Sequence, residues 1–321
     1  MGYEREHTPG TPTWIDLTSP DLVTSARFYG GLLGWDTALR GPADMTGGYL
    51  TFRVDGLDVA GLGRLGDDDE PPAWTTYFAV GDIAAGGEAV GRAGGHVLVP
   101  PEEVFEAGHR ALFTDPTGAV FGLWQPEGLR GAGLVGSPGA MCWNQLASRN
   151  IEASKRFYGT VFGWESNTTP YETSTYTSFR LDGREIAGMV EMDRSWPRGL
   201  PSHWMTHLRV DDCDAVAAEA VELGGEISVE PYEVPQIGRT AVIGDPHGAV
   251  FSILTPNEKV LDLYRRRRAE VDAEIAHDRF VDTGGTIVIP DDPLEIEVEL
   301  EAAKSAEVGD EIAVAGERKS A

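Results

Sequence analysis

Residues 108–126 read GHRALFTDPTGAVFGLWQP, and residues 238–256 read GRTAVIGDPHGAVFSILTP. The two stretches are offset by 130 residues, and the same offset relates Trp74 to Trp204. Further upstream the offset falls to 129 and then to 127, which indicates small insertions in the loops between matched elements. A repeat of this length indicates that one structural unit has been duplicated.

The limits of the match define the organisation of the chain. Residues 11–128 and 139–256 are predicted to be two copies of one module. Residues 129–138 belong to a Gly-rich stretch, LRGAGLVGSPG, which is typical of a linker. Residues 257–321 have no counterpart in the repeat, so they are predicted to be a C-terminal extension.

Each module is predicted to contain two halves with one order of elements. The first half has a strand at 13–18, an amphipathic helix in DLVTSARFYGGLLG, and strands near 36–40, 49–54 and 58–63. The order recurs as TTYFAV, a helix from Ile83, and the strands HVLVP, RALFT and AVFGLW. Asp-Pro-x-Gly before the last strand favours a tight hairpin, because Pro fixes φ and Gly accepts a positive φ.

Composition excludes two classes of partner. The 321 residues include 52 acidic and 26 basic ones, a formal net charge of -26, which opposes non-specific contact with nucleic acid or with a membrane surface. No apolar run reaches the roughly 18 residues of a membrane span, and the polar start lacks a signal-peptide core. Cys142 and Cys213 lack the spacing of a disulfide framework or a structural zinc site. We therefore expect a cytoplasmic monomer or homodimer whose partner is a small molecule.

Three features together resemble the vicinal oxygen chelate superfamily, which includes glyoxalases, bleomycin-resistance proteins and extradiol dioxygenases. They are the βαβββ halves, the first helices with ARFYGGLLGW and KRFYGTVFGW, and the module ends DPTGAVFGL and DPHGAVFSI. The resemblance covers about residues 11–256 and is nearest to two-module actinobacterial members, such as a secreted mycobacterial glyoxalase-like antigen. It implies an α+β fold in which each module forms a cup-shaped sheet. Because this fold hosts many activities, the function has to be argued from the site.

The resemblance also implies where a metal would bind. In metal-using members the ligands are His, Gln or Glu from the first, fifth and last strands of a module. The aligned residues are Trp14, Thr75 and Gly122 in the first module, and Trp143, Met205 and Ser252 in the second. None of these six is a normal ligand for a divalent cation. We therefore expect no metal and no other cofactor.

Strand alternation predicts what lines each cup, because side chains two apart share a face. The first cup would receive Trp14, Asp16, Thr75, Tyr77, Gly122 and Trp124. The second would receive Trp143, Gln145, Met205, His207, Ser252 and Leu254. The first is aromatic with one carboxylate, and the second is aromatic and apolar with an amide and an imidazole. Both suit a flat, largely apolar small molecule.

The sequence leaves two explanations open for several of these residues. Trp14 and Trp143 are either stacking walls for a ligand or large aromatics that fill the cups. Asp16 is either hydrogen-bonded to a neighbour such as Tyr77 or kept for a ligand, because an unpaired buried carboxylate is costly. His207 is either a satisfied core histidine or an acid–base group.

These patterns predict metal-independent binding of a flat, aromatic or polyketide-like molecule, in a sequestering, resistance or carrier role. One alternative is a metal-independent tailoring enzyme of natural-product metabolism that uses Asp16 with Tyr77, or His207, as acid and base. A conventional metal-dependent glyoxalase or dioxygenase is the third possibility.

Two structural expectations complete the prediction. In the extension, EKVLDLYRRRRAEVDAEIAHDRF has helical spacing, while TIVIP and LEIEVELE alternate like strands. Each module already has its full set of strands, so we expect a separate hydrophobic core in each.

Overall fold

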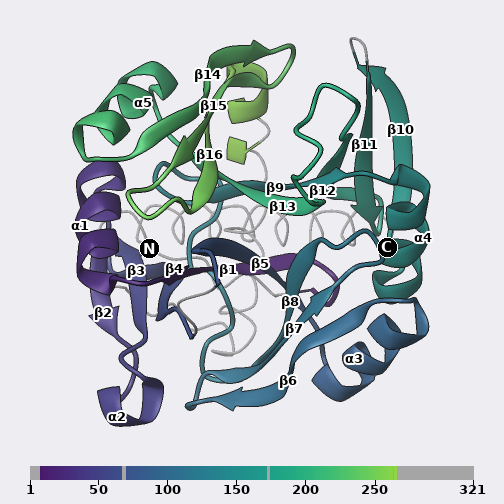
Figure 1. Cartoon of the computed structure of the whole chain (residues 1–321), viewed down its shortest axis with the longest axis horizontal. Coiled ribbons are helices and arrows are strands. Elements are labelled where there is room, and N and C mark those ends of the chain that lie inside the picture. Colours follow the sequence, from purple (N-terminus) through teal and green to yellow (C-terminus); the bar gives the residue numbers. More distant parts are fainter. Residues whose placement is uncertain (1–7, 67–69, 172–173, 263, 266–321) are drawn as a thin grey trace, which may run out of the picture. The chain divides into compact units, whose positions relative to one another are not determined.

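The first repeat supplies the elements of one sheet and the helices beside it (Figure 1). In chain order they are β1 (Pro12–Ser19), α1 (Leu22–Leu33), β2 (Asp36–Leu39), α2 (Ala43–Thr46), β3 (Leu50–Val54), β4 (Leu57–Arg64), β5 (Ala73–Ala79), α3 (Ile83–Arg92), β6 (His96–Val104), β7 (Gly108–Thr114) and β8 (Val120–Pro126). The eight strands form sheet 1 in the order β2-β3-β4-β1-β5-β8-β7-β6.

The second repeat gives the same arrangement. Its elements are β9 (Met141–Ser148), α4 (Ile151–Phe162), β10 (Glu165–Tyr171), β11 (Ser174–Leu181), β12 (Arg184–Glu191), β13 (His203–Arg209), α5 (Cys213–Glu222), β14 (Glu226–Val234), β15 (Gly238–Gly244) and β16 (Val250–Pro256). They form sheet 2 in the order β10-β11-β12-β9-β13-β16-β15-β14. The predicted α+β class and the duplicated order of strands are confirmed.

The computed structural model describes residues 8–66, 70–171, 174–262, 264 and 265. The described residues up to Asn257 form one compact unit, and a second unit begins at Glu258. Residues 258–262 begin a helix, while the rest of the predicted extension, including both of its strands, lies outside the described residues. Of the helices in the described part, none has the length and apolar character that crossing a bilayer requires.

The first helix of each module begins and ends as its sequence indicates. The Asp21 side chain accepts hydrogen bonds from the backbone N–H groups of Val23 and Thr24 at the start of α1, which satisfies donors that have no partner within the helix. Gly34 ends α1 in the left-handed conformation, which glycine adopts without a steric penalty. Asn150 and Gly163 bound α4 in the same way.

The hydrophobic cores do not follow the module boundaries. One core joins Phe28 and Tyr29 on α1 to Phe251 on β16 of the other module. The other large core joins residues around Phe78 on β5 to residues around Tyr158 on α4, whereas a third, smaller core lies within the first module and the linker. In keeping with this, α1 lies beside α5, and α3 lies beside α4 (Figure 1). The expectation of a separate core in each module is therefore wrong, because the helices of each module pack partly against the other sheet.

Two buried hydrogen bonds lock the modules together at the repeated Asp-Pro turns. The Tyr158 hydroxyl donates to Asp115 Oδ2 at 3.2 Å, and the Tyr29 hydroxyl donates to Asp245 Oδ2 at the same distance. The other oxygen of Asp115 accepts the backbone N–H of Ala119 at 3.0 Å within its own hairpin. Each turn aspartate thus holds its own hairpin and the first helix of the other module. This double role gives the repeated stretch a function that hairpin formation alone does not explain.

Candidate functional site

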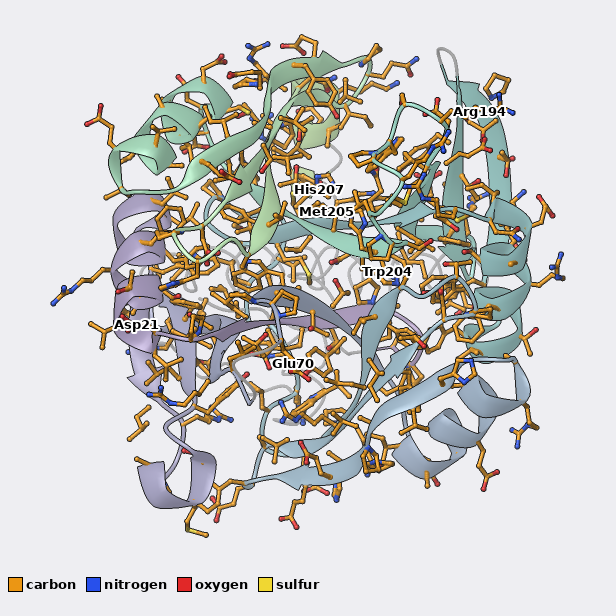
Figure 2. The ribbon with its side chains drawn as sticks, viewed as in Figure 1. Asp21, Glu70, Arg194, Trp204, Met205 and His207 are labelled. Carbon is orange, nitrogen blue, oxygen red and sulfur yellow. The ribbon has the colours of Figure 1, made fainter. Side chains whose placement is uncertain are left out.

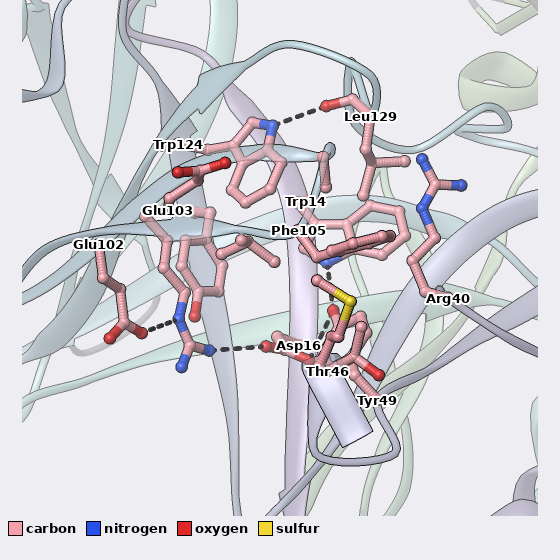
Figure 3. A pocket seen from close by; sticks show the side chains of 15 residues that line it. Trp14, Asp16, Arg40, Thr46, Tyr49, Glu102, Glu103, Phe105, Trp124 and Leu129 are labelled. Atoms are coloured by element: carbon pink, nitrogen blue, oxygen red, sulfur yellow. Dashed lines mark hydrogen bonds and ion pairs between the residues drawn. The ribbon is translucent and has the colours of Figure 1, made fainter. Parts of the chain in front are cut away.

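One face of sheet 1 carries Trp14, Asp16 and Tyr77, and we call this face the first cup. It contains a cavity of about 220 Å³ (Figure 3). Its aromatic walls are Trp14, Tyr49, Tyr77, Phe105 and Trp124, and its charged groups are Asp16, Arg40, Glu102, Glu103 and Arg110. Sites that enclose drug-sized ligands measure roughly 300 to 1,000 Å³. The cavity therefore suits a molecule of one or two rings, or one end of a larger flat molecule.

The strand register decides which residues stand side by side in the first cup. Trp14 pairs with Tyr77 across β1 and β5, and Tyr77 pairs with Gly122 across β5 and β8. Thr75 instead pairs with Asp16 and lies outside the cavity lining. The three residues aligned with ligand positions of the family, Trp14, Thr75 and Gly122, are therefore not paired in one row, because Tyr77 stands between Trp14 and Gly122. Any side chain at position 122 would overlap the Tyr77 ring, so the glycine lets this ring lie against β8.

Asp16 is buried beneath the cavity and has several polar neighbours (Figure 3). Only 5% of its side chain is exposed. The Tyr49 hydroxyl donates to Asp16 Oδ1 at 3.2 Å and accepts the Trp14 indole N–H at the same distance. Arg110 Nη1 lies 3.8 Å from Asp16 Oδ2, too far for a hydrogen bond of ordinary length. The carboxyl group therefore has a hydrogen-bonding partner, which agrees with the first of the two explanations given for Asp16. It also lines the cavity, where a ligand could reach it.

The electrostatic environment moves the pKa values of two groups in this cup. Burial raises the pKa of Asp16 from 3.8 to about 6, against the opposing effects of Arg110 and of hydrogen bonds from Tyr49 and Tyr77. Burial, together with the charge of Asp16, raises the pKa of Tyr77 well above its ordinary value. The Asp16 carboxyl group therefore gains or loses its proton close to neutral pH, whereas the Tyr77 phenol keeps its proton there.

Strand alternation alone did not identify Arg110 and Tyr49 as cup residues. Arg110 pairs directly with Trp124 across the β7–β8 hairpin, whose turn is the Asp-Pro-x-Gly motif. If the cup face that carries Trp124 on β8 had been continued to the paired position on β7, the sequence would have identified Arg110. Tyr49 precedes β3, and its ring lies over Gly61, where a side chain would overlap it. No local pattern in the sequence marks that contact.

The second cup is the corresponding face of sheet 2. Trp143, Gln145, Met205 and His207 are each partly exposed, and Met205 and His207 lie along β13 (Figure 2). The Trp143 indole N–H donates to the Tyr176 hydroxyl at 3.1 Å, which repeats the Trp14–Tyr49 contact of the first cup.

The corresponding row in the second cup consists of Trp143, His207 and Ser252. His207 pairs with Trp143 on one side and with Ser252 on the other, so His207 rather than Met205 holds the middle position. Ser252 is buried, and its hydroxyl is hydrogen-bonded to Thr240 Oγ1 and to the Ala241 carbonyl at 2.9 and 3.0 Å. Both hydrogen bonds of this hydroxyl are therefore made within sheet 2.

The His207 ring is held neutral. Burial lowers the pKa of His207 from 6.5 to about 4. Its Nε2 atom is buried and has no hydrogen-bond partner among the described residues. A neutral imidazole without a carboxylate partner is a weak acid–base group at neutral pH, so His207 is less suited to that role than Asp16.

Comparison with known proteins identifies the family. The sequence model of the Glyoxalase/Bleomycin resistance protein/Dioxygenase superfamily matches residues 11–123 and again residues 141–253. The chain belongs to this superfamily. The match to both repeats confirms the predicted tandem arrangement of superfamily modules.

Two relatives match most of the length of this chain. "Putative glyoxylase CFP32" of Mycobacterium bovis is 35% identical over 263 residues, which cover 80% of this chain and 98% of that protein. The "Anthracycline biosynthesis protein DnrV" of Streptomyces peucetius is 37% identical over 265 residues, which cover 78% of this chain and 94% of that protein.

Solved structures of superfamily members share the fold at low identity. The Mn(II)-bound glyoxalase of Novosphingobium aromaticivorans has a TM-score of 0.53 at 16% identity, covering 79% of this chain and 83% of that chain. A catechol 2,3-dioxygenase has a TM-score of 0.53 at 13% identity, covering 77% and 89% of the two chains. At these identities the likeness shows the fold alone.

The donor atoms of the two rows do not fit the divalent cation that many superfamily members use. In the first cup Trp14 and Gly122 offer no side-chain lone pair suited to a metal, and the Tyr77 phenol keeps its proton. In the second cup His207 offers one nitrogen, beside Trp143 and the hydrogen-bonded hydroxyl of Ser252. In the described part of the chain, no group of three or more His, Cys, Asp or Glu side chains could hold a metal ion.

Proposed function

We propose that the first cup binds a flat aromatic small molecule without the help of a metal ion. The observation that carries this proposal is a cavity of about 220 Å³ walled by indole and phenol rings. Trp14 and Trp124 supply stacking area, and Asp16 and Arg110 supply polar groups that would fix orientation.

The two tryptophans of the first cup are held in place by hydrogen bonds and are almost fully buried, with 2% of Trp14 and 3% of Trp124 exposed. The Trp124 indole N–H donates to the Leu129 carbonyl at 2.9 Å, and the Trp14 indole N–H is bound by Tyr49. Both rings are thus fixed by hydrogen bonds at one edge, while they line an open volume. Fixed rings lose little conformational entropy when a ligand stacks on them, which favours affinity.

The relatives narrow the class of ligand. A protein named for anthracycline biosynthesis shares 37% identity over 78% of this chain, and anthracyclines are flat aromatic polyketides. We therefore propose an aromatic polyketide, or an intermediate related to one, as the ligand, in a sequestering, resistance or carrier role within the cytoplasm.

The test uses 1,8-dihydroxyanthraquinone as a probe, after dialysis of the protein against a chelator. Binding is followed by the visible absorbance of the probe and by isothermal titration calorimetry. Trp124→Ala should weaken binding of the probe about tenfold or more. Stacking of a flat ring on an aromatic side chain, as known for nucleic-acid bases, contributes roughly 1 to 3 kcal/mol. Saturable binding that requires added metal, or that is unaffected by this substitution, would contradict the proposal.

A second candidate function is acid–base catalysis on the same ligand, and the Asp16 environment favours it. A carboxyl group with a pKa of about 6 beside a cavity is suited to accept and return a proton near neutral pH. Tyr77 would act beside it as a hydrogen-bond donor, because its raised pKa keeps the phenol protonated.

Mass spectrometry separates these two functions. After incubation with a candidate metabolite, unchanged recovery of a tightly bound compound supports binding alone, whereas a new mass supports the enzyme. Asp16→Asn should abolish any such turnover and retain binding of the compound. Turnover that persists in this variant would exclude Asp16 as the acid–base group.

A further inference from the structure

The charged groups around the first cavity do not balance. Arg40 Nη1 contacts Asp58 Oδ2 at 3.1 Å, and Arg110 Nε contacts Glu102 Oε1 at 2.7 Å. Each guanidinium that lines the cavity therefore has a carboxylate of its own. Two further carboxylates line the cavity, the exposed Glu103 and the buried Asp16. The nearest cation to Asp16 is the Arg110 group at 3.8 Å, which is already bound to Glu102.

Asp16, the surplus carboxylate beneath the cavity, is also more deeply buried than the two carboxylates that pair with Arg110 and Arg40. The Asp16 side chain is 5% exposed, against 45% for Glu102 and 21% for Asp58. Water can solvate the two outer carboxylates, but it has little access to Asp16. A buried carboxylate with incomplete compensation attracts a cation more strongly than an exposed one does.

The aromatic walls favour a cation as well. Trp14, Trp124 and Tyr77 line the same volume as Asp16, and Figure 3 labels the two tryptophans and Asp16 around it. Indole and phenol faces attract ammonium and guanidinium groups through the ring quadrupole. An anion placed there would meet the negative faces of the rings and the surplus carboxylate.

The second cup provides an internal contrast. Strand register places Gln145 where the first cup has Asp16, Thr240 where it has Arg110, and Tyr232 where it has Glu102. The second cup therefore keeps the tryptophan and tyrosine pair but replaces each of these three charged groups with a neutral one. The charge of the first cup is a local property of that site and not a requirement of the fold.

We propose that the ligand of the first cup carries a protonated amine, which lies against the Asp16 carboxylate while the flat ring of the ligand contacts Trp14 and Trp124. This inference rests on the proposed function, because it specifies the class of ligand for the same cavity. The ligand is thus an aromatic amine-bearing compound and not an acidic one.

Three probes of one shape and different charge test the proposal on the full chain by isothermal titration calorimetry. They are 1-naphthylmethylamine, 1-naphthylmethanol and 1-naphthoate, which are cationic, neutral and anionic near pH 7.5. The amine should bind about ten- to a hundredfold more tightly than the alcohol, as expected for a hydrogen bond to a charged group. The carboxylate should bind most weakly.

Two variants and one control assign this preference to Asp16. Asp16→Asn should remove most of the advantage of the amine and leave the affinity for the alcohol within about twofold. Glu102→Gln should reduce the advantage several-fold, because Arg110 is then left to Asp16 alone. Glu222→Gln removes the same single charge from an exposed position on α5, and it should change nothing. Circular dichroism checks the folding of each variant, and Glu102→Gln carries the test by itself if Asp16→Asn does not fold.

The outcomes separate this inference from the proposed function. Equal affinity for the amine and the alcohol, or tighter binding of 1-naphthoate, would overturn the inference and leave aromatic binding intact. An equal loss in Glu222→Gln and Asp16→Asn would assign the preference to the overall negative charge, which also overturns it. Failure of all three probes to bind would overturn the proposed function and the inference together.

Discussion

The two cups have the same framework and different polar contents. Both keep a tryptophan on the first strand whose indole N–H is bound by a tyrosine hydroxyl, at 3.2 Å in the first cup and 3.1 Å in the second. At the centre of the row, however, Tyr77 in the first cup corresponds to His207 in the second. The framework residues meet the demands of the shared fold, and the polar ones differ because the fold does not depend on them.

The contrast extends to how much of each cup is open. Trp14 is 2% exposed at the base of a cavity with charged walls, whereas Trp143 is partly exposed in a neutral cup. Duplication has thus produced two concave faces with different electrostatic properties. Because the cores are shared between modules, the cups differ in chemistry but depend on each other for stability.

The largest expected effect tests that mutual dependence. Tyr158→Ala removes a fully buried ring and its hydrogen bond to Asp115 of the other module. It should lower the free energy of unfolding by about 3 to 5 kcal/mol. Urea unfolding, followed by tryptophan fluorescence and by circular dichroism, should remain a single transition. Two separate transitions, with only one of them shifted, would show that the modules are independent.

A smaller effect separates the two tryptophans. Trp14→Ala should cost about 3 to 5 kcal/mol of stability, because the ring is almost fully buried. Trp143→Ala should cost about half as much, because its ring is already partly exposed. Thermal unfolding of both variants measures the difference. Equal losses would mean that the two cups are equally filled.

Asp16 should make stability fall as the pH rises. The native carboxyl group has a pKa of about 6, against its ordinary value of 3.8, so between these pH values the native state holds a proton that the unfolded state has lost. The free energy of unfolding therefore decreases from about pH 4 to about pH 6, by at most about 3 kcal/mol. Asp16→Asn should remove this decrease in a series of urea titrations. A parallel pH dependence of wild type and variant would contradict it.

His207 should affect the pH dependence of stability in the opposite direction and by a smaller amount. Its pKa is about 4 in the native state, against its ordinary value of 6.5, so below pH 6.5 the unfolded state binds a proton that the native state does not bind. Stability is therefore lost as the pH falls from 6.5 towards 4. We expect about 1 to 2 kcal/mol, because the ring is partly exposed. His207→Gln should remove this loss of stability. If the variant still loses the same stability between pH 6.5 and 4, His207 does not cause the loss.

The smallest expected effect is that of a chelator. Since neither row of cup residues fits a divalent cation, dialysis against EDTA should change neither the melting temperature nor the binding of the anthraquinone probe. Elemental analysis should find well below one equivalent of Zn, Fe, Mn or Ni for each chain. One equivalent, lost together with binding on dialysis, would refute the proposal of metal-independent binding.

Much of the fold could be predicted because its signals are local. Asp115-Pro116-x-Gly118 forms the expected turn, and the first helix lies within the stretch predicted for it. The pairing of β1 with β5, and of β9 with β13, places Tyr77 and His207 beside the first-strand tryptophans, and alternation along one strand does not set this register. Those strands lie more than 50 residues apart in the sequence, and their register is decided by packing on both faces of the sheet.

The sequence by itself determined the duplication, the order of the strands and the face on which Trp14, Asp16 and Tyr77 lie, since alternation along a strand has a fixed period of two. Only the tertiary structure decided that Tyr49 and Arg110 approach Asp16, and that Tyr158 binds an aspartate of the other module. These contacts join segments that are far apart in the chain, so no local periodicity encodes them. The pKa of Asp16 belongs to the same class, because burial is its main cause and burial exists only once the sheet and its neighbours have assembled.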